Sequence, residues 1–474
     1  MQILHSTAEY FPFIKMGGLS DMLSSLSRQQ AKSHRVGVAI PKTKGLKESP
    51  HWTGRQILVY ETKSDTTNPA VRILKDSVFR EAEWKGVMLY FLDSPVFREL
   101  DGIYQNPDEH FRFAIYSYAC FVLSLELKVD VFHAHDWHTA LGCALHKASP
   151  WGKSTVFTIH NLAYQGDHPH WMTGFLEEEP FYLSRSSMDQ NGKINYMKAG
   201  IMTADKITTV SPGYRNETLW EPNGFGLSYA LSFKSENYRG ILNGIDTEEW
   251  NPKIDPHIPY KYDKNSISKG KLKNKKSLLE EIQRPNLDSN RPLVGLIGRL
   301  TYQKGYETFL KAFLNRPRLN HFFLFLGAGD SELEAKLFHE SHHNSDRIYF
   351  YKGYSESFAR KIEAASDFFL MPSLFEPCGL NQFYSHAYGS IPIVSRVGGL
   401  RDSVDESIFE ERQTGIVFEP NDADSLGFAL ERAETLYEDK RKFELIQKTI
   451  MQLDWSWKQR VAEYETVYEE ASHR

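Results

Sequence analysis

Short apolar segments recur along the whole chain, and stretches with helical spacing separate them. Several are apolar almost throughout, which is typical of strands buried on both faces of a parallel sheet. One intervening stretch places Leu19, Met22, Leu23 and Leu26 at the i, i+3, i+4, i+7 spacing of an amphipathic helix. The alternation predicts an α/β fold with doubly wound parallel sheets. The predicted strands are Gln2–Ser6, Val36–Ile40, Val87–Leu92, Val131–His135, Thr155–His160, Lys206–Val210, Leu293–Ile297, Phe322–Leu326, Ile348–Tyr351, Phe368–Met371, Ile391–Ser395 and Gly415–Phe418.

These strands exceed the roughly 4–6 of a typical sheet, so we expect two sheets in two domains. The boundary is predicted at Asn243-Gly244, because Asn-Gly is a turn signal that follows the last strand of the first set. Residues 252–276 hold few candidates for a core, although Lys269–Leu279 has the pattern of a short basic helix. A final amphipathic helix is predicted over Trp455–Glu470. The predicted segments are residues 1–243, 244–454 and 455–474.

The net charge and the number of cysteines exclude several classes of protein. The 56 Lys and Arg against 61 Asp and Glu give a net charge of −5, which offers no bulk attraction for nucleic acid or an anionic membrane. No apolar run approaches the ~20 residues of a membrane span, and the first residues lack the basic region of a secretory signal. Cys120, Cys143 and Cys378 are odd in number and far apart, which favours a reducing compartment. We therefore expect a soluble cytoplasmic protein, with Cys378 a packed residue and not a nucleophile.

A glycine pair follows the first predicted strand. Lys15 precedes Gly17 and Gly18, and the amphipathic helix begins directly after them. Free N–H groups at a helix start suit a phosphate, and the lysine would add a positive charge. A flexible turn with a solvated lysine explains the same residues, because neither a GxGxxG nor a Walker pattern is present.

The segment His133–His138 concentrates imidazoles with one carboxylate at a strand end. A zinc site is one interpretation, but on a strand His133 and His135 share a face while Asp136 points away. Ligands of open α/β sheets bind beyond the carboxyl ends of strands, so we favour Asp136 and His138 as cleft residues. His160 ends the next strand and falls on the same rim. Structural roles for His133 and His135, and a capping role for His160, stay open.

Two loops in the second half follow apolar strands. Arg299 and Lys304 lie in one of them, where a guanidinium fork and a point charge suit a diphosphate. A solvated basic loop is the alternative. Glu376 lies in the other loop, and its carboxylate could accept two sugar hydroxyls. Backbone N–H groups near Leu380 would open a helix predicted over Asn381–Tyr388.

Taken in order, the motifs of these loops resemble those of the bacterial glycogen synthase family, relatives of plant starch synthases. The resemblance runs from residue 2 to about residue 470. The matching motifs are Lys15-x-Gly17-Gly18-Leu19, His135-Asp136-Trp137-His138, Thr158-Ile159-His160-Asn161, Leu242-Asn243-Gly244-Ile245-Asp246, Gly298-Arg299-Leu300-x-x-Gln303-Lys304-Gly305, Phe375-Glu376-Pro377-Cys378-Gly379-Leu380 and Gly398-Gly399-Leu400-x-Asp402.

The resemblance implies a GT-B fold, in which two Rossmann-like domains face each other across a cleft. It implies transfer of glucose from ADP-glucose to the non-reducing end of an α-1,4-glucan, with retention of configuration and without a metal or other cofactor. Residues 1–243 would then serve the acceptor and carry the glycine-rich loop. Residues 244–454 would bind the nucleotide sugar, and the helix of residues 455–474 would pack back on the first domain.

The resemblance also implies roles for single residues. Arg299 and Lys304 would bind the diphosphate, and Glu376 would hold the glucose 3- and 4-hydroxyls beside the amides of Gly379 and Leu380. Further implied positions are His160 near the 6-hydroxyl, Asp136 in the catalytic cleft, Lys15 with the Gly17 and Gly18 amides over the donor, Tyr354 against the base and Asn243 near the hinge. Related transferases often carry a second Glu eight residues after the first, where this chain has Tyr384.

Two other functions compete with this hypothesis. A catalytically silent glucan-binding protein of the same fold is one, although a pure binder has no need of a diphosphate clamp. A nicotinamide oxidoreductase is the other, and it is poorly supported, because Gly327-Ala328-Gly329 is too short to be a dinucleotide fingerprint.

Overall fold

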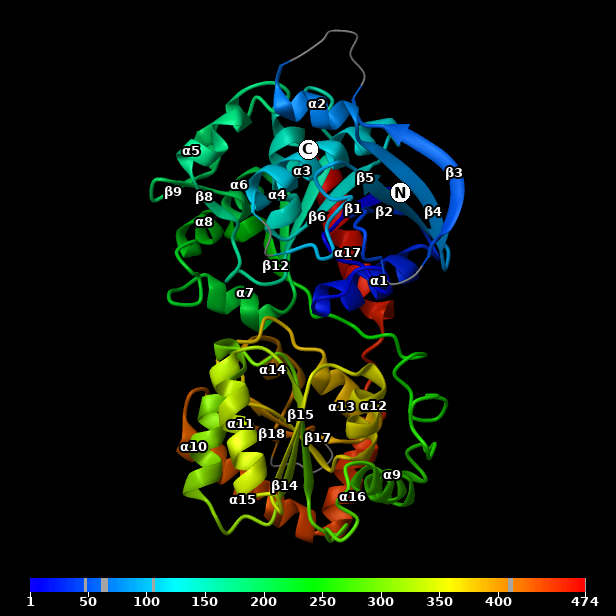
Figure 1. The fold of residues 1–474 in the computed structure, drawn as a ribbon, viewed down its shortest axis with the longest axis vertical. Helices are drawn as coiled ribbons and strands as arrows, with labels where there is room; N and C mark the ends of the chain where they lie inside the picture. The colour runs from blue at the N-terminus through cyan, green and yellow to red at the C-terminus, as the bar shows by residue number, and fades with distance from the viewer. Residues whose placement is uncertain (47–48, 61–66, 105–106, 408–411, 474) are drawn as a thin grey trace. The chain divides into compact units, whose positions relative to one another are not determined.

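The chain forms two compact units in the computed structural model, which describes residues 1–46, 49–60, 67–104, 107–407 and 412–473. Unit 1 comprises Met1–Asn243 and Trp457–Arg474, and unit 2 comprises Gly244–Ser456. Each unit is an α/β layer structure built on one large sheet (Figure 1). The predicted doubly wound α/β architecture is therefore confirmed.

Unit 1 is built on a sheet ordered β12-β11-β7-β6-β1-β2-β5-β4-β3. The seven strands from β12 to β5 are mutually parallel within the described residues. Their order along the sheet reverses direction between β1 and β6, which makes this pair the topological switch point. The strands are β1 (Gln2–Ser6), β2 (Arg35–Pro41), β3 (His51–Leu58), β4 (Val78–Trp84), β5 (Val87–Asp93), β6 (Val131–His135), β7 (Ser154–Ile159), β11 (Lys206–Thr209) and β12 (Tyr238–Gly240).

One edge of the unit 1 sheet departs from the predicted parallel arrangement. β4 runs antiparallel to both β5 and β3. Lys85 and Gly86 both have positive φ in the two-residue turn between β4 and β5, as a tight hairpin requires. β3 is exposed along nearly its whole length, so it lacks the apolar pattern by which the buried strands were recognised.

Helices cover both faces of the unit 1 sheet. On one face α1 (Gly18–Gln30) packs beside α17 (Trp457–Ser472), which also contacts β6 and β7. On the other face lie α3 (Glu109–Glu126) and α4 (Trp137–Ala148). The smaller elements are α2 (Pro69–Lys75), α5 (His170–Thr173), α6 (Tyr196–Thr203), α7 (Pro212–Thr218), α8 (Ser228–Phe233), and the antiparallel strands β8 (Asp167–Pro169), β9 (Asp189–Gln190) and β10 (Lys193–Asn195).

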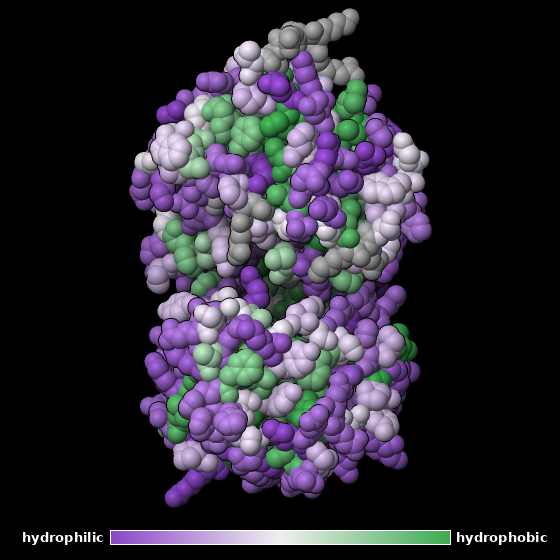
Figure 2. Space-filling view, in the orientation of Figure 1, coloured by the Kyte–Doolittle hydropathy of each residue, from purple (hydrophilic) through white to green (hydrophobic). Residues whose placement is uncertain are grey.

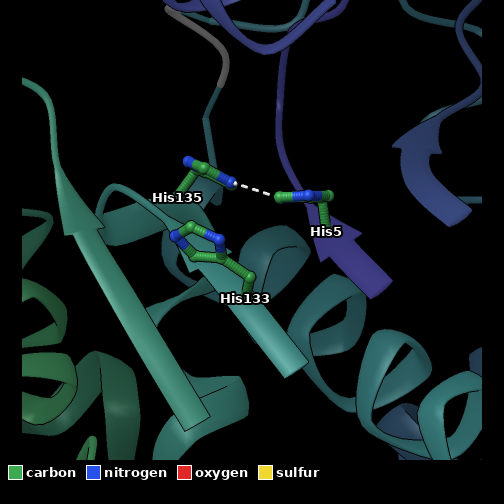
Figure 3. Close-up of side chains that lie close together, drawn as sticks. All are labelled: His5, His133 and His135. Carbon is green, nitrogen blue, oxygen red and sulfur yellow. Dashed lines mark hydrogen bonds between the residues drawn. The ribbon is translucent and has the colours of Figure 1, made fainter. Parts of the chain in front are cut away.

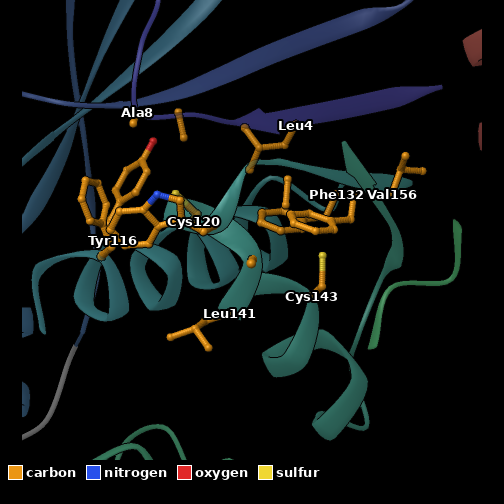
Figure 4. Packing of buried hydrophobic residues seen from close by; sticks show 14 of the residues in the cluster. Leu4, Ala8, Tyr116, Cys120, Phe132, Leu141, Cys143 and Val156 are labelled. Carbon is orange, nitrogen blue, oxygen red and sulfur yellow. The ribbon is translucent and has the colours of Figure 1, made fainter. Parts of the chain in front are cut away.

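Alternation along the central strands divides the core of unit 1 between these faces. Leu4 of β1 and Phe132 of β6 pack with the buried thiols Cys120 and Cys143 of α3 and α4 (Figure 4). A Cβ on Gly142 would lie 2.7 Å from the Phe132 ring, so α4 approaches the sheet closely only because that residue is glycine. The residues that follow Leu4 and Phe132 in these strands, His5 and His133, point to the face of α1 and α17.

Unit 2 is built on a six-stranded parallel sheet within its described residues, ordered β15-β14-β13-β16-β17-β18. This is the strand order of a dinucleotide-binding fold, with the switch point between β13 and β16. The strands are β13 (Leu293–Ile297), β14 (Phe322–Gly327), β15 (Ile348–Lys352), β16 (Phe368–Met371), β17 (Ile391–Ser395) and β18 (Ile416–Phe418).

Two apolar layers enclose this second sheet. Phe323 and Phe325 of β14 pack with α10, α11, α15 and α16, whereas Leu324 and Leu326 pack with α9 and α12. The helices are α9 (Ile267–Glu281), α10 (Tyr306–Asn315), α11 (Ser331–His343), α12 (Glu356–Ala365), α13 (Asn381–Tyr388), α14 (Gly398–Ser403), α15 (Ala423–Glu438) and α16 (Lys440–Ile450).

The surface is hydrophilic on the face drawn in Figure 2, where apolar residues are scattered over each unit. None of the helices in the described part of the chain combines the length and the apolar character that crossing a bilayer requires.

Candidate functional site

Two loops meet at the switch point of unit 2. One follows β13 and the other follows β16, and these strands are neighbours in the sheet. Gly305 has φ +65, and a Cβ there would lie 1.8 Å from the Pro372 carbonyl oxygen. The Leu374 amide donates to the Gln303 carbonyl at 2.8 Å, and the Gln303 side chain donates to the Phe375 carbonyl at 3.2 Å. The two loops are thus fixed against each other by backbone contacts that only glycine permits at residue 305.

Lys304 and Glu376 form an ion pair where these loops meet. Lys304 Nζ lies 2.6 Å from Glu376 Oε2, which also accepts the Ser373 hydroxyl at 2.9 Å. Glu376 is only 5% exposed, so a charged partner is needed to hold an ionised carboxylate there. The structure therefore brings together two residues, 72 positions apart, that the sequence analysis had assigned to one site.

Glycines also fix the backbone of Glu376. A Cβ on Gly398, which has φ +39, would lie 2.0 Å from the Glu376 carbonyl oxygen. That oxygen accepts the Gly399 amide at 3.1 Å. The glycine pair at the start of α14 thus supports the carboxylate from behind.

The same two loops carry further hydrogen-bond donors. Arg299 is exposed and makes no hydrogen bond or ion pair with any described residue. The amides of Gly379 and Leu380, at the start of α13, likewise donate to no acceptor in the part of the chain that the structure describes. A cationic side chain and the amino end of a helix at one sheet edge are suited to an anionic ligand.

Tyr354 and Asn243 belong to other parts of the chain than these two loops. Tyr354 is 65% exposed and follows β15, which β14 separates from β13. Asn243 is the last residue of the first segment of unit 1 and is 5% exposed. Its Oδ1 is buried and has no hydrogen-bond partner among the described residues.

The glycine-rich loop of unit 1 is held by a residue that the sequence analysis missed. Glu9 Oε2 accepts the amides of Met16 at 2.7 Å and Gly17 at 2.8 Å, and Oε1 accepts the Tyr104 hydroxyl at 2.6 Å. The expectation of a free N–H at Gly17 is therefore wrong for this structure, because a carboxylate already accepts it. The signal was present in the sequence as an acidic residue between the first strand and the glycine pair.

Lys15 is also engaged. Its Nζ lies 2.9 Å from Asp21 Oδ1 on α1 and 4.9 Å from the centre of the Phe11 ring. The ammonium group is therefore held beside the start of α1 and is not a freely moving surface charge.

Asp136 occupies the switch point of unit 1, directly after β6. Its φ of 56 and ψ of 179 belong to a region that residues other than glycine rarely adopt, and such strain clusters at functional sites. Its Oδ1 accepts the amides of His160 at 2.7 Å and Asn161 at 3.4 Å. Burial raises the pKa of Asp136 to about 7 despite these amides. The predicted association of Asp136 with the loop of His160 is confirmed by these contacts.

His160 is the end of a buried row of imidazoles. Its Nε2 lies 3.0 Å from His135 Nδ1, and His135 Nε2 lies 3.0 Å from His5 Nδ1. Figure 3 shows the His5 and His135 rings joined in this way, with His133 beside them. Burial lowers the pKa of His5 to about 4 and of His160 to about 3, so these rings are neutral at pH 7.

The cluster of His5, His133 and His135 has the composition of a metal site, but its nitrogens are engaged otherwise. Each of their six ring nitrogens has a hydrogen-bond partner. The partners are Gln30 and His135 for His5, Tyr468 and Thr158 for His133, and His5 and His160 for His135. A fully satisfied network is the interpretation that the geometry supports, in line with the structural role considered for His133 and His135.

We expected His138 to enter the cleft, but its side chain is buried among aromatic rings instead. Its ring is 6% exposed and packs against Phe113, Trp137 and Tyr104, with centroid separations of 4.7, 4.2 and 5.0 Å. Burial lowers its pKa to about 3. His138 lies on the first turn of α4 and is part of the aromatic packing beneath Asp136.

Comparisons with known proteins give this arrangement a family. Residues 2–233 match the model of the starch synthase catalytic domain, and residues 279–448 match glycosyl transferases group 1. A glycogen synthase from Leptospira biflexa is 59% identical over 471 residues, which cover 99% of this chain and 98% of that protein. A glycogen synthase from Cellvibrio japonicus is 36% identical, with 98% of each chain covered.

Solved structures agree with these matches. The catalytic domain of starch synthase IV from Arabidopsis thaliana, bound to ADP and acarbose, superposes with a TM-score of 0.86 at 29% identity, covering 100% of this chain and 99% of that one. A sucrose-phosphate synthase from Thermosynechococcus elongatus shares the fold at a TM-score of 0.63 and 17% identity, with 99% of each chain covered. The fold is thus that of the GT-B glycosyltransferases, and the chain belongs to the glycogen synthase family.

Proposed function

We propose that this enzyme transfers glucose from ADP-glucose to the non-reducing end of an α-1,4-glucan, with retention of configuration and without a metal ion. The Lys304–Glu376 pair at the switch point of unit 2, with Arg299 in the same loop as Lys304, carries the proposal. The high identity to a full-length relative named glycogen synthase supports it.

The charge of the leaving group accounts for the positively charged side chains at this site. Breaking the bond between glucose and phosphate places negative charge on the departing diphosphate and positive charge on the anomeric carbon. Lys304 and the amides that open α13 are held in place before the reaction, and such preorganised donors stabilise developing charge without reorganisation. Arg299 adds a second positive charge in the same loop as Lys304. A divalent cation is therefore not needed to neutralise the diphosphate in this proposal.

Glu376 acts as a clamp on the sugar and not as a nucleophile. One of its oxygens already accepts Lys304 and Ser373, which lowers its availability for attack. Double displacement would instead require carboxylates about 5 Å apart on either side of the anomeric carbon. We propose that Glu376 accepts the glucose 3- and 4-hydroxyls beside the amides of Gly379 and Leu380.

The other candidate residues are divided between a donor-binding unit and an acceptor-binding unit. Unit 2 binds the nucleotide sugar, with Tyr354 against the base, and unit 1 binds the glucan. Asp136 and His160 act near the sugar, while the glycine-rich loop with Lys15, Gly17 and Gly18 covers the donor. Asn243 adjoins the hinge between the units. We place the enzyme in the cytoplasm, where glycogen and its nucleotide-sugar donor are found.

The direct test is incorporation of labelled glucose into glycogen, measured side by side with ADP-glucose and UDP-glucose and repeated after treatment with EDTA. We expect faster incorporation from ADP-glucose and no loss of rate with EDTA. Faster incorporation from UDP-glucose would overturn the donor assignment, and a rate abolished by EDTA would overturn the metal-independent mechanism. Binding of glycogen without incorporation from either donor would indicate a silent glucan-binding protein.

A further inference from the structure

The imidazole row that ends at His160 is hydrogen-bonded at its other end to Gln30, the last residue of α1. Gln30 Oε1 lies 2.8 Å from His5 Nε2, and the row continues through His135 to His160 with nitrogen–nitrogen separations of 3.0 Å. His5, His135 and Gln30 are fully buried. None of these three residues has a part in the mechanism proposed above.

The position of each proton in this row follows from Gln30. The carbonyl oxygen of an amide only accepts, so His5 Nε2 donates to it. A neutral imidazole carries one N–H, so His5 Nδ1 accepts from His135 Nε2–H. His135 Nδ1 in turn accepts from His160 Nε2–H. One amide oxygen therefore fixes the tautomers of three successive rings, because burial keeps each ring neutral.

A second branch orients Gln30 itself. Its Nε2 donates to the Tyr468 hydroxyl of α17 at 2.9 Å. The Tyr468 O–H finds its acceptor in His133 Nδ1 at 2.9 Å, and His133 Nε2–H then donates to Thr158 Oγ1 at 2.6 Å. With its nitrogen bonded to Tyr468, the amide presents its oxygen to His5. Tyr468 of the last helix, α17, is thereby linked to His160 through Gln30, His5 and His135.

The open end of the row is His160 Nδ1. This nitrogen has no hydrogen-bond partner among the described residues, although the Nε2 of the same ring is occupied by His135. The Asp136 carboxylate holds the His160 backbone amide, so the ring is fixed at both the main chain and Nε2. An Nδ1 lone pair held in this way is able to accept a hydrogen bond from a hydroxyl of a ligand.

We propose that Gln30, acting through His5 and His135, holds His160 as the Nε2–H tautomer, so that His160 Nδ1 accepts a hydrogen bond from a hydroxyl of the bound sugar. Gln30, His5 and His135 are thus positioning residues, and His160 is the residue that touches substrate. The part concerning the sugar rests on the proposed function, whereas the tautomer is a property of the protein alone.

Nitrogen NMR of the full-length protein labelled with ¹⁵N-histidine tests the tautomer directly. The His160 resonances are assigned by their loss in His160→Ala. We expect a neutral ring at pH 7 with the proton on Nε2. A proton on Nδ1, or a charged ring, would overturn the proposal whether or not the protein transfers glucose.

Substitutions at Gln30 test whether this residue sets the tautomer of His160. Gln30→Met removes the acceptor for His5, and we expect a mixture of His160 tautomers and a fall in kcat/KM of about tenfold, the effect of one substrate hydrogen bond. Gln30→Glu keeps an acceptor toward His5 and is expected to retain the Nε2–H tautomer and most of the activity. Ser27→Ala is the matched control, because Ser27 is buried in the same helix and bonds Tyr10 outside the row.

A donor analogue separates a positioning effect from a general loss of structure. The penalty of Gln30→Met is measured with ADP-glucose and with the analogue that lacks the 6-hydroxyl. We expect the penalty to shrink with the analogue, since no hydroxyl then reaches Nδ1. An equal penalty with both donors, or a Gln30→Met variant indistinguishable from Ser27→Ala in tautomer and kcat/KM, would contradict the proposal. Absence of transfer by the wild-type enzyme would instead reject the proposed function and leave the NMR test standing.

Discussion

At the scale of single residues, several candidate binding groups are each held in place by a side chain from another part of their loop or of the chain. Lys304 is paired with Glu376, Lys15 with Asp21, and the Gly17 amide with Glu9. Each pairing fixes a group that the sequence presents only as a polar residue in a loop. The charges therefore act from defined positions, as electrostatic stabilisation of a departing anion requires.

Lys304→Ala tests the most important of these charges. We expect turnover to fall at least ~100-fold, because a preorganised donor to the leaving group is lost. Initial rates of glucose incorporation measure the effect, and circular dichroism checks the fold. Lys311→Ala is the control, since Lys311 is exposed on the adjoining α10. Equal rates in both variants would reject the role of Lys304.

At the scale of elements, strands were predicted far better than the polar segments between them. β1, β6, β13, β16 and β17 have the predicted bounds, because strands buried on both faces are mostly apolar. α9 is different, since Lys271, Asn274 and Lys275 are buried in it although the sequence offered few core residues there. Lys271 Nζ is satisfied by the carbonyl oxygens of Glu363 and Tyr388, contacts that no local pattern reveals.

α17 is the element whose partners lie farthest away in sequence. Its buried residues include Trp457, Tyr464 and Tyr468, and it packs on α1 and β7 of unit 1. Its periodicity predicts an amphipathic helix, and the structure supplies the surface that it covers. The C-terminal segment is therefore part of the core of unit 1.

Tyr464→Ala measures what this helix contributes. We expect a loss of about 3–5 kcal/mol in the free energy of unfolding of unit 1, the usual effect of removing a buried aromatic ring. Denaturant unfolding followed by tryptophan fluorescence gives the value. Glu469→Ala, on the exposed side of the same helix, should be neutral within about 0.5 kcal/mol. Similar values for both variants would show that the helix does not stabilise the unit.

At the scale of the whole molecule, both units place their functional loops at a topological switch point. In unit 1 this point lies between β1 and β6, and in unit 2 between β13 and β16. Loops that leave neighbouring parallel strands at the same edge meet there. The same principle thus gathers Asp136 near the buried imidazoles in unit 1, and Lys304 near Glu376 in unit 2.

The buried imidazoles make the stability of the protein depend on pH. Burial lowers the pKa of His5 to about 4, of His138 and His160 to about 3, and of His133 and His135 well below the ordinary value. Between about pH 6.5 and pH 4 these histidines therefore bind protons in the unfolded chain but stay neutral in the folded chain. Each histidine then costs on the order of 1 kcal/mol per pH unit as pH falls.

Asp136 has the opposite sign. Its folded pKa of about 7 lies above its unfolded value, so the stability that it contributes is present at low pH and is lost as pH rises. Five histidines outweigh this one carboxyl, and we expect the free energy of unfolding of unit 1 to fall steeply from pH 6.5 toward pH 4. Urea titrations across this range provide the measurement, and an unchanged midpoint between pH 6.5 and pH 5 would show that the rings are not held neutral.

The sequence by itself determined the α/β class, the parallel strands at the centre of each sheet and the family, because these depend on local periodicity and on motifs contiguous in the chain. Through the family resemblance it also assigned Arg299, Lys304 and Glu376 to one site, and the strand ends that share an edge of the parallel sheet bring the loops of Lys304 and Glu376 together. Only the tertiary structure decided that Glu9 holds the glycine-rich loop and that Gln30 and Tyr468 meet a row of histidines. Those contacts join residues up to 438 positions apart, and no local pattern specifies which buried polar groups will find one another.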